Sequence, residues 1–273
     1  MEKESSMILF DFDSTLSSVE MFDIIGMVVD ICENRYQGNS LAFDCDIFFN
    51  EYLQGNYQHQ LKYHKNQSYD TLLTFKLKDK LDNEKIANQI FSQRTIDDYR
   101  DKDEGYKWFY SAVIELLKHL KFKVDLLEKI GIFIWLNYIA KDKIKLINKL
   151  KNNGHYVAIA SGGFYDIIKM SAQNLDVDLF AVSINKDKDS LISLKYDGFD
   201  VGKSAGLKSS LNYSSYRNRI IVGDGSNDRE VFDDGVCNKW IAYSEIHQHN
   251  FHNQATSIAK DFNEVDEYLS ELI

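Results

Sequence analysis

The first residues in the chain that could do chemistry are two carboxylates, Asp11 and Asp13, in the run 8–20, which reads ILFDFDSTLSSVE. One carboxylate can act as a nucleophile while the other exchanges a proton with a leaving group. A divalent cation would balance this crowded negative charge, and Mg²⁺ favours carboxylate oxygens together with substrate phosphate. A capped helix start is the alternative reading, because Asp and Ser commonly begin helices.

A second segment, 157–164, reads VAIASGGF and places a hydroxyl before two glycines. Ser161 can donate to a phosphate oxygen, and glycine lets backbone N–H groups approach an anion closely. The segment is not the nucleophile elbow of serine hydrolases, because that pattern requires glycine two residues before the serine, where Ile159 stands. An ordinary strand-to-helix turn is the alternative reading of this segment.

A third segment, 200–204, reads DVGKS and fails the nucleotide-binding P-loop pattern by one residue. That pattern needs four residues between its first glycine and Gly-Lys-Ser, whereas Gly198 and Gly202 are separated by only three. What remains is Lys203 just before an expected helix at 204–211. A solvated surface lysine is the alternative reading of Lys203.

The fourth segment, 219–228, reads RIIVGDGSND and carries Asp224 and Asp228. A calcium-binding EF-hand that began at Asp224 would need glycine and glutamate where Arg229 and Gly235 stand, so that reading fails. Together the four segments offer carboxylates, a hydroxyl beside exposed amides, and a lysine. This combination suits phosphoryl transfer, which requires a nucleophile, a metal, oxyanion donors and a cationic group.

The elements that must position these residues are short apolar runs typical of buried parallel strands. In open α/β sheets, ligands bind outside the carboxyl ends of such strands. Strands are predicted at 7–10, 156–160, 180–184, 219–222 and 240–243, helices at 143–152, 165–174 and 227–234, and a β-hairpin at 190–199 with its turn at Asp197-Gly198. The alternation of strands and helices predicts a doubly wound, mostly parallel sheet.

The four segments resemble, in order, the signatures of the haloacid dehalogenase (HAD) superfamily, in its phosphoserine-phosphatase-like branch. The resemblance implies an α/β fold, with a HAD-like doubly wound parallel sheet (a Rossmann-like core) at 1–20 and 141–273. An inserted all-helical cap would occupy 21–140. The implied activity is a Mg²⁺-dependent phosphomonoester hydrolase that acts on a small phosphorylated metabolite, with phosphoserine as the leading candidate.

The resemblance also implies a role for each residue of the site. Asp11 would attack phosphorus and carry an aspartyl-phosphate, and Asp13 would protonate the leaving alcohol and later activate water. Mg²⁺ would be bound by Asp11, the Asp13 carbonyl and Asp224, and the phosphoryl oxygens by Ser161, the Gly162 amide and Lys203. Asn227 and Glu20 would contact the substrate. Asp228 would support the metal site or Lys203.

The expected cap leaves the substrate open. Members of this branch grip the substrate carboxylate with a cap arginine on a helix that begins soon after a glycine, but the equivalent stretch here, 55–64, offers Lys62 and His64 and no arginine. Arg35, Arg94 and Arg100 lie elsewhere in the insert. The aromatic residues of the cap could instead enclose a quaternary ammonium, although core packing is the simpler use of them. Phosphocholine, phosphoethanolamine and a non-catalytic binding role therefore remain alternatives.

Whole-chain properties agree with an enzyme of small molecules. A net charge of −10 over 273 residues argues against nucleic-acid and anionic-membrane partners, which require cationic surface. Three cysteines without a CxxC pair, and an N-terminus without a signal-peptide pattern, favour a reducing cytoplasm. The apolar stretch 130–140 is too short to span a bilayer and is expected to be a buried helix. The histidines at 247, 249 and 252 suggest zinc, but a solvated loop is expected because no cysteine or carboxylate joins them closely.

Overall fold

The computed structural model describes residues 5–21, 24–25, 110, 114, 117–118, 123–188 and 190–273. The chain divides into two compact units. The core unit comprises Met1–Val19, Gly131–Ser183 and Tyr196–Ile273, and the second unit comprises Glu20–Ile130 and Ile184–Lys195. The cap stretch 55–64, the cap arginines and aromatic residues, Cys32 and Cys45 lie outside the described residues.

The core unit is built around a six-stranded sheet in which all neighbouring strands run parallel. The strand order is β3-β2-β1-β6-β7-β8, with β1 at Met7–Phe10, β2 at Tyr156–Phe164, β3 at Asp178–Val182, β6 at Arg219–Gly223, β7 at Lys239–Tyr243 and β8 at Ser257–Ala259. All four residues of β1 are completely buried. Continuous apolar runs of this kind are expected where helices cover both faces of a parallel sheet.

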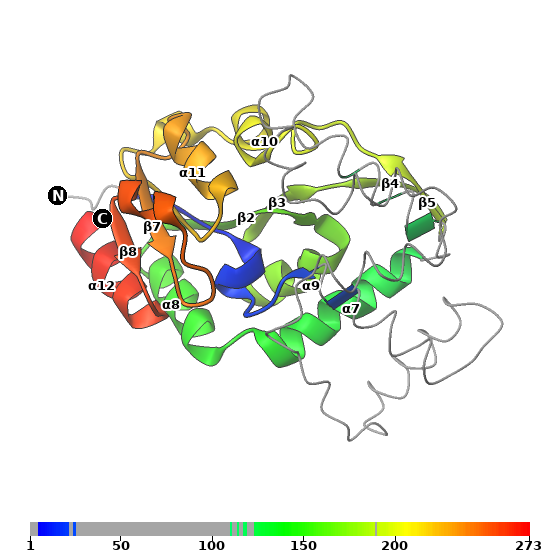
Figure 1. Cartoon of the computed structure of the whole chain (residues 1–273), viewed down its shortest axis with the longest axis horizontal. Coiled ribbons are helices and arrows are strands. Elements are labelled where there is room, and N and C mark those ends of the chain that lie inside the picture. The colour runs from blue at the N-terminus through cyan, green and yellow to red at the C-terminus, as the bar shows by residue number, and fades with distance from the viewer. Residues whose placement is uncertain are drawn as a thin grey trace. The chain divides into compact units, whose positions relative to one another are not determined.

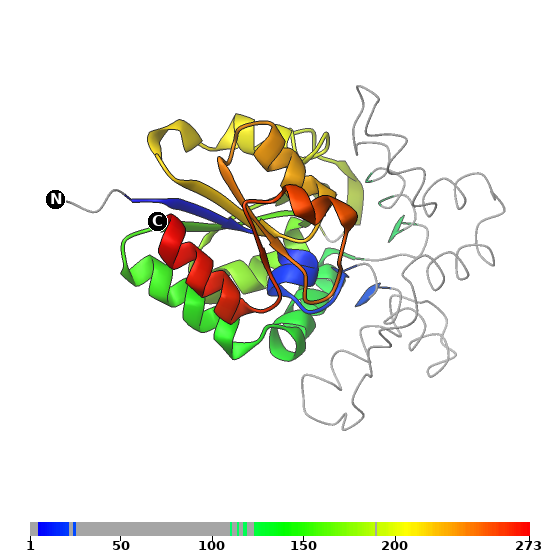
Figure 2. The ribbon, with the colours of Figure 1, turned by 60° about the vertical axis from the view of Figure 1, so that its left-hand side comes forward.

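Helices cover both faces of this sheet (Figures 1 and 2). On one face lie α8 (Lys141–Asn152), α9 (Tyr165–Leu175) and α12 (Phe262–Leu272), and on the other lie α10 (Lys203–Ser210) and α11 (Ser226–Asp233). The predicted doubly wound α/β core is therefore confirmed. The predicted helices differ from α8, α9, α10 and α11 by only one or two residues at their ends.

Helix α7 (Val124–Tyr138) includes residues 130–138 of the apolar stretch 130–140 that was expected to form a buried helix. Ile130, Phe133 and Ile134 are buried, but Leu136 is 60% exposed, so only one side of the helix is covered. A Cβ added to Gly131 would lie 2.1 Å from the backbone oxygen of Ile167 in α9. The close packing of α7 on α9 thus requires glycine at this position. None of the helices in the described ranges is both long and apolar enough to cross a membrane.

The predicted hairpin at 190–199 is wrong. The antiparallel pair is β4 (Ile184–Asp187) with β5 (Ser190–Leu194), both of which belong to the second unit. The aspartates at 197 and 200 accept hydrogen bonds from the backbone N–H groups of Phe199 and Gly198, at 3.3 and 2.9 Å. Because these side chains close a local turn, the Asp197-Gly198 pair leads toward α10 instead of joining two strands. The described part of the second unit therefore contains a β-hairpin besides its helical residues.

Candidate active site

The candidate site lies where the strand order of the sheet reverses. From β1 the chain adds β2 and β3 on one side, and it then returns to add β6, β7 and β8 on the other side. Asp11 directly follows β1, and Asp224 directly follows β6, its parallel neighbour. The carboxyl ends of the two strands at such a switch point form the usual ligand crevice of open α/β sheets.

The segment after β1, Phe12–Leu16, is a tight turn in which the Ser17 amide donates to the Phe12 carbonyl oxygen and the backbone at Asp13 and Ser14 is not helical. The Phe12 amide donates to Asp11 Oδ1 at 2.8 Å, and Ser14 adopts a left-handed backbone with φ of 53°. Left-handed backbone at a non-glycine residue is uncommon and is concentrated at functional sites. Because the chain turns directly after Asp11, the side chains of Asp11 and Asp13 are not placed by the alternation of an extended strand.

A buried lysine on α8 supports the same turn. Lys143 Nζ donates to the carbonyl oxygen of Thr15 at 2.6 Å and lies 5.4 and 4.9 Å from the ring centroids of Tyr243 and Phe262. Burial lowers the pKa of Lys143, against an opposing effect of nearby carboxylates. Thr15 Oγ1 in turn donates to Asp224 Oδ1 at 3.4 Å, which connects the turn after β1 to the carboxylate after β6.

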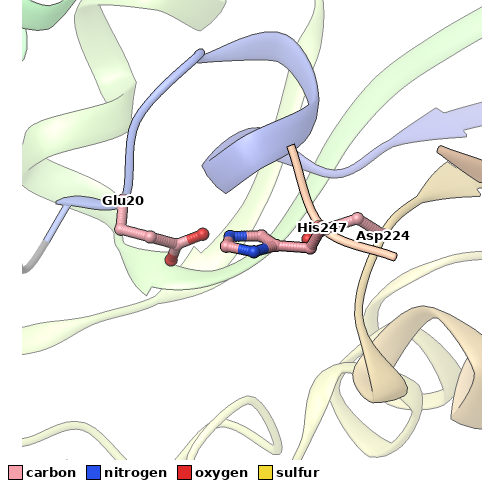
Figure 3. A group of neighbouring side chains, drawn as sticks. All are labelled: Glu20, Asp224 and His247. Atoms are coloured by element: carbon pink, nitrogen blue, oxygen red, sulfur yellow. The ribbon is translucent and has the colours of Figure 1, made fainter. Parts of the chain in front are cut away.

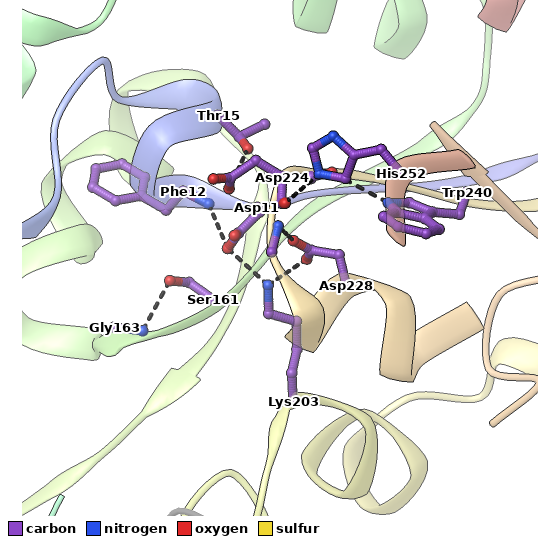
Figure 4. A network of polar contacts seen from close by, with 12 residues as sticks. Asp11, Phe12, Thr15, Ser161, Gly163, Lys203, Asp224, Asp228, Trp240 and His252 are labelled. Atoms are coloured by element: carbon purple, nitrogen blue, oxygen red, sulfur yellow. Dashed lines mark hydrogen bonds and ion pairs between the residues drawn. The ribbon is translucent and has the colours of Figure 1, made fainter. Parts of the chain in front are cut away.

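The centre of the site is Lys203, the first residue of α10, held between two carboxylates (Figure 4). Its Nζ lies 2.8 Å from Asp11 Oδ1 and 2.5 Å from Asp228 Oδ1. Lys203 is 3% exposed and Asp228 is completely buried. A buried charge must be paired to be tolerated, so one ammonium between two carboxylates leaves excess negative charge for a cation to neutralise.

The pKa values of both Asp11 and Lys203 are raised above their usual values. Burial first, and the neighbouring Asp228 carboxylate second, raise the pKa of Asp11 from its usual 3.8 to about 7, although Lys203 acts in the opposite direction. Burial would lower the pKa of Lys203, but the carboxylates of Asp11 and Asp228 outweigh it and hold that pKa above its usual value. A bound divalent cation would favour the ionised form of Asp11, because it supplies the missing positive charge.

Glycine at 223 is required by the packing of Asp228. A Cβ added to Gly223 would lie 2.2 Å from Asp228 Cγ, which leaves no room for any side chain. Asp228 Oδ2 accepts a hydrogen bond from the Gly225 amide at 2.9 Å, across the first turn of α11. The carboxylate is therefore fixed on both oxygens, by Lys203 and by the helix start.

The segment at the end of β2 brings a hydroxyl and a carboxylate together around Gly163. Ser161 Oγ is buried and accepts a hydrogen bond from the Gly163 amide at 2.9 Å. A Cβ added to Gly163 would lie 3.2 Å from Ser161 Oγ and 3.3 Å from Asp13 Oδ2. Asp13 thus has its carboxylate beside the Ser-Gly-Gly segment, and Gly162, the middle residue, is half-buried.

Three carboxylates could hold a metal ion. Asp11, Asp224 and Asp228 each offer a buried oxygen, and these oxygens lie within 4.8 Å of one another. A donor set of carboxylate oxygens alone fits a hard cation such as Mg²⁺ and does not fit zinc, which prefers nitrogen and sulfur. Two of the three predicted ligands, Asp11 and Asp224, are brought together, and Asp228, expected as a support, joins them.

Solved structures with a similar fold include proteins named as phosphoserine phosphatases. A phosphoserine phosphohydrolase-like protein from Francisella tularensis subsp. tularensis SCHU S4 matches with a TM-score of 0.61 and 18% identity over 97% of this chain and 99% of that chain. This chain has the phosphoserine-phosphatase fold. A substrate-bound phosphoserine phosphatase gives a TM-score of 0.56 at 17% identity, over 98% of this chain and 99% of that chain. The predicted resemblance to the HAD phosphatases is thereby confirmed at the level of the fold.

A phospho-aspartyl intermediate analogue of phosphoserine phosphatase also matches, with a TM-score of 0.55 and 18% identity over 97% of this chain and 99% of that chain. Neither the family models nor the curated proteins compared with the sequence give a match. The likeness to the phosphoserine-phosphatase fold therefore comes from structure, at an identity too low to carry the reaction across by itself.

The solvated loop expected for the histidines is wrong for one of them. His252, in the short helix η3 (Asn250–Gln254), is 2% exposed, and its Nε2 lies 2.8 Å from the backbone oxygen of Asp224. Within the described ranges, the histidines at 247, 249 and 252 do not form a three-residue metal-binding group with one another. His247 instead offers a ring nitrogen within 4.8 Å of an oxygen of Asp224 (Figure 3). The histidine run thus belongs to the surroundings of the acidic site.

Two other predicted site residues, Asn227 and Glu20, lie in different units of the chain. Asn227 is half-buried in the first turn of α11. Glu20, also drawn in Figure 3, is the first residue of the second unit. Sequence reasoning missed the contributions of Thr15, Lys143 and His252. A lysine in register with the buried Leu146, Ile147 and Leu150 of α8 was the available signal for Lys143, since an apolar residue is expected there.

Proposed function

We propose that this chain is a Mg²⁺-dependent phosphomonoesterase that acts on a small phosphorylated metabolite through an aspartyl-phosphate. The observation that carries the proposal is the buried group of Asp11, Lys203 and Asp228, with Asp224 beside it, at the switch point of the sheet. Three buried carboxylates with a single lysine between two of them are costly for a purely structural site, because the excess negative charge is removed from water. A site that receives both a cation and a phosphate accounts for that arrangement.

Asp11, Asp224 and Asp228 supply the oxygens from which Mg²⁺ would be held, with the Asp13 carbonyl as the further ligand inferred from the resemblance. When bound, Mg²⁺ would neutralise charge and polarise the phosphoryl group. Lys203, already between two carboxylates, would exchange part of that pairing for a phosphoryl oxygen. Ser161 and the Gly162 amide lie on the segment that would receive the remaining oxygens.

The reaction would begin with attack of an Asp11 carboxylate oxygen on phosphorus, which forms an acyl-phosphate bond as the ester P–O bond breaks. Asp13 would give its proton to the departing alcohol. In the second half, Asp13 would remove a proton from water, whose oxygen attacks phosphorus and restores Asp11 with release of inorganic phosphate. The position of Asp13 Oδ2 beside Gly163 and Ser161 supports this role, since the leaving oxygen is attached to the same phosphorus.

Phosphoserine is the leading substrate. Support comes from the fold of proteins named phosphoserine phosphatases and from Glu20, whose carboxylate suits a cationic amine. Phosphocholine and phosphoethanolamine carry the same charge pattern, so they are the alternatives within this class. A non-catalytic binding protein on the same fold is the alternative outside it, and the complete set Asp11, Asp13, Lys203 and Asp224 argues against that reading.

The test is release of phosphate from a panel of phosphorylated metabolites and from an aryl phosphate, with Mg²⁺ and with excess EDTA. We expect hydrolysis with Mg²⁺ only, and none by Asp11→Asn. Asp233→Asn is the matched control, because Asp233 is an exposed aspartate that pairs with Arg229 on the outer side of α11. Binding of a metabolite without release of phosphate by the wild type would favour the non-catalytic alternative. A Glu20→Gln loss on amine-bearing substrates alone would support the amine contact.

A further inference from the structure

Two ring N–H groups bind consecutive carbonyl oxygens at the point where β6 ends. Trp240 Nε1 donates to the Gly223 oxygen at 3.2 Å, and His252 Nε2 lies 2.8 Å from the Asp224 oxygen (Figure 4). The two rings meet edge to face, with centroids 6.0 Å apart and planes at 83°. Trp240 lies in β7 and His252 in η3, so residues of β7 and η3 hold the backbone at Gly223 and Asp224.

The direction of the His252 hydrogen bond is determined by chemistry. A carbonyl oxygen can only accept, so Nε2 must carry the proton and His252 must donate. The ring is 2% exposed, and its Nδ1 has no hydrogen-bond partner among the described residues. A buried polar atom without a partner is unfavourable, and phenylalanine or leucine would fill the same space without it. Packing alone therefore does not explain a histidine here.

His252 binds the backbone of Asp224, whose carboxylate is a candidate metal ligand. Asp224 projects its carboxylate toward Asp11 and Asp228, and Thr15 bonds that carboxylate at the long distance of 3.4 Å. The 2.8 Å bond from His252 acts on the backbone of the same residue, after the last paired residue of β6, Gly223. Groups that orient a metal ligand typically change metal affinity by about 10–100-fold when they are removed.

We propose that His252 is a positioning residue that fixes the backbone of Asp224 and thereby aims its carboxylate at the Mg²⁺ site. This inference rests on the proposed function, because it presupposes a cation at Asp11, Asp224 and Asp228. The proposed role of His252 requires no contact of its own with the cation or the substrate. Its effect passes through one hydrogen bond to a main-chain oxygen.

The test compares variants that separate the donor from the ring. His252→Phe keeps an aromatic ring and removes the donor, whereas His252→Gln keeps an N–H donor and removes the ring. His252→Met matches the glutamine in length but cannot donate, so it repeats the comparison if the phenylalanine variant fails to fold. His249→Phe is the control for ring packing, because His249 meets the His252 ring edge to face with centroids 5.3 Å apart and the variant leaves the His252 donor in place.

The readouts are the Mg²⁺ dissociation constant from calorimetry, the Tm without metal, and kcat on an aryl phosphate at saturating Mg²⁺. We expect His252→Phe and His252→Met to weaken Mg²⁺ binding at least about tenfold. Their kcat should largely recover at saturating Mg²⁺. His252→Gln should retain most of the affinity, and His249→Phe should bind as the wild type does.

An unchanged Mg²⁺ dissociation constant in His252→Phe and His252→Met would overturn the inference, even if Tm falls. Equal weakening in the donor and non-donor variants would also overturn it, since that pattern indicates packing. Failure of the proposed function has a different signature. In that case the wild-type protein itself would neither bind Mg²⁺ in calorimetry nor hydrolyse the aryl phosphate, whatever residue stands at 252.

Discussion

Ionisation of Asp11 should lower the stability of the metal-free protein as pH rises. The substitution Asp11→Asn should abolish this pH-dependent loss of stability. The pKa of Asp11 is raised from 3.8 to about 7, a difference of about 3 units. At about 1.36 kcal/mol per unit, ionisation of Asp11 costs the folded state up to roughly 4 kcal/mol. Because the folded state binds the Asp11 proton more tightly than the unfolded state does, removal of that proton destabilises the folded state. The contribution of Asp11 to stability is therefore most favourable below about pH 4 and falls until about pH 7.

The assay is thermal unfolding in EDTA from pH 4.5 to 8. Asparagine does not ionise, so the free energy of unfolding of Asp11→Asn relative to the wild type should rise by up to about 1.4 kcal/mol per pH unit until about pH 7. Above that pH the difference should stay constant. For a protein of this size, a lead of about 3 kcal/mol corresponds to roughly 6–12 °C in Tm. Asp233→Asn keeps Asp11, so its Tm should change with pH as that of the wild type does. Mg²⁺ at pH 8 should stabilise the wild type and not Asp11→Asn.

Equal pH dependence of Tm in the wild type and Asp11→Asn would refute the reasoning, because the buried carboxylate would then have no unusual pKa. A wild type that is more stable than the variant at pH 8 without metal would refute it more strongly. In that event the pairing of Asp11 with Lys203 would outweigh both burial and the repulsion from Asp228.

Three further substitutions follow from the geometry. Asp224→Ala should abolish hydrolysis or raise the Mg²⁺ requirement steeply, and Ca²⁺ should replace Mg²⁺ poorly because its coordination is larger and looser; full activity of the variant at low Mg²⁺ would contradict this. Gly131→Ala should destabilise by about 1–3 kcal/mol in urea unfolding, since its Cβ would lie 2.1 Å from the Ile167 oxygen, and a wild-type midpoint would show that α7 moves freely. Lys143→Met should lower stability by about 1–3 kcal/mol through loss of its bond to Thr15, and an unchanged midpoint would show that the bond contributes nothing net.

Local patterns predicted the part of the fold that carries the site. The apolar runs of β1, β2 and β6 are continuous because both faces of each strand are covered, and Asp11 and Asp224 directly follow two of them. The hairpin could not be located in the same way. Asp197-Gly198 has the composition of a hairpin turn, but its side chains bond locally and the real pairing lies upstream. β8 has only three residues, too few to show a period.

Sequence reasoning missed the supporting residues of the site because their partners are far away along the chain. Lys143 meets Thr15 across 128 residues, and His252 meets Asp224 across 28. Lysine is mostly exposed and histidine is intermediate, and the packing of α8 and η3 shows that these two residues are buried. The cap boundaries at 20/21 and 140/141 and a cytoplasmic setting stay predictions, as does the phosphoserine substrate.

The measurement that tests the central claim most directly is identification of the residue that becomes phosphorylated. The protein is mixed with an aryl phosphate and Mg²⁺, quenched in acid during turnover, and reduced with borohydride, which converts an aspartyl-phosphate to homoserine. Peptide mass spectrometry should then find homoserine at position 11, and none in samples without Mg²⁺ or in Asp11→Asn. Homoserine at another aspartate, or sustained release of phosphate by Asp11→Asn, would contradict the account.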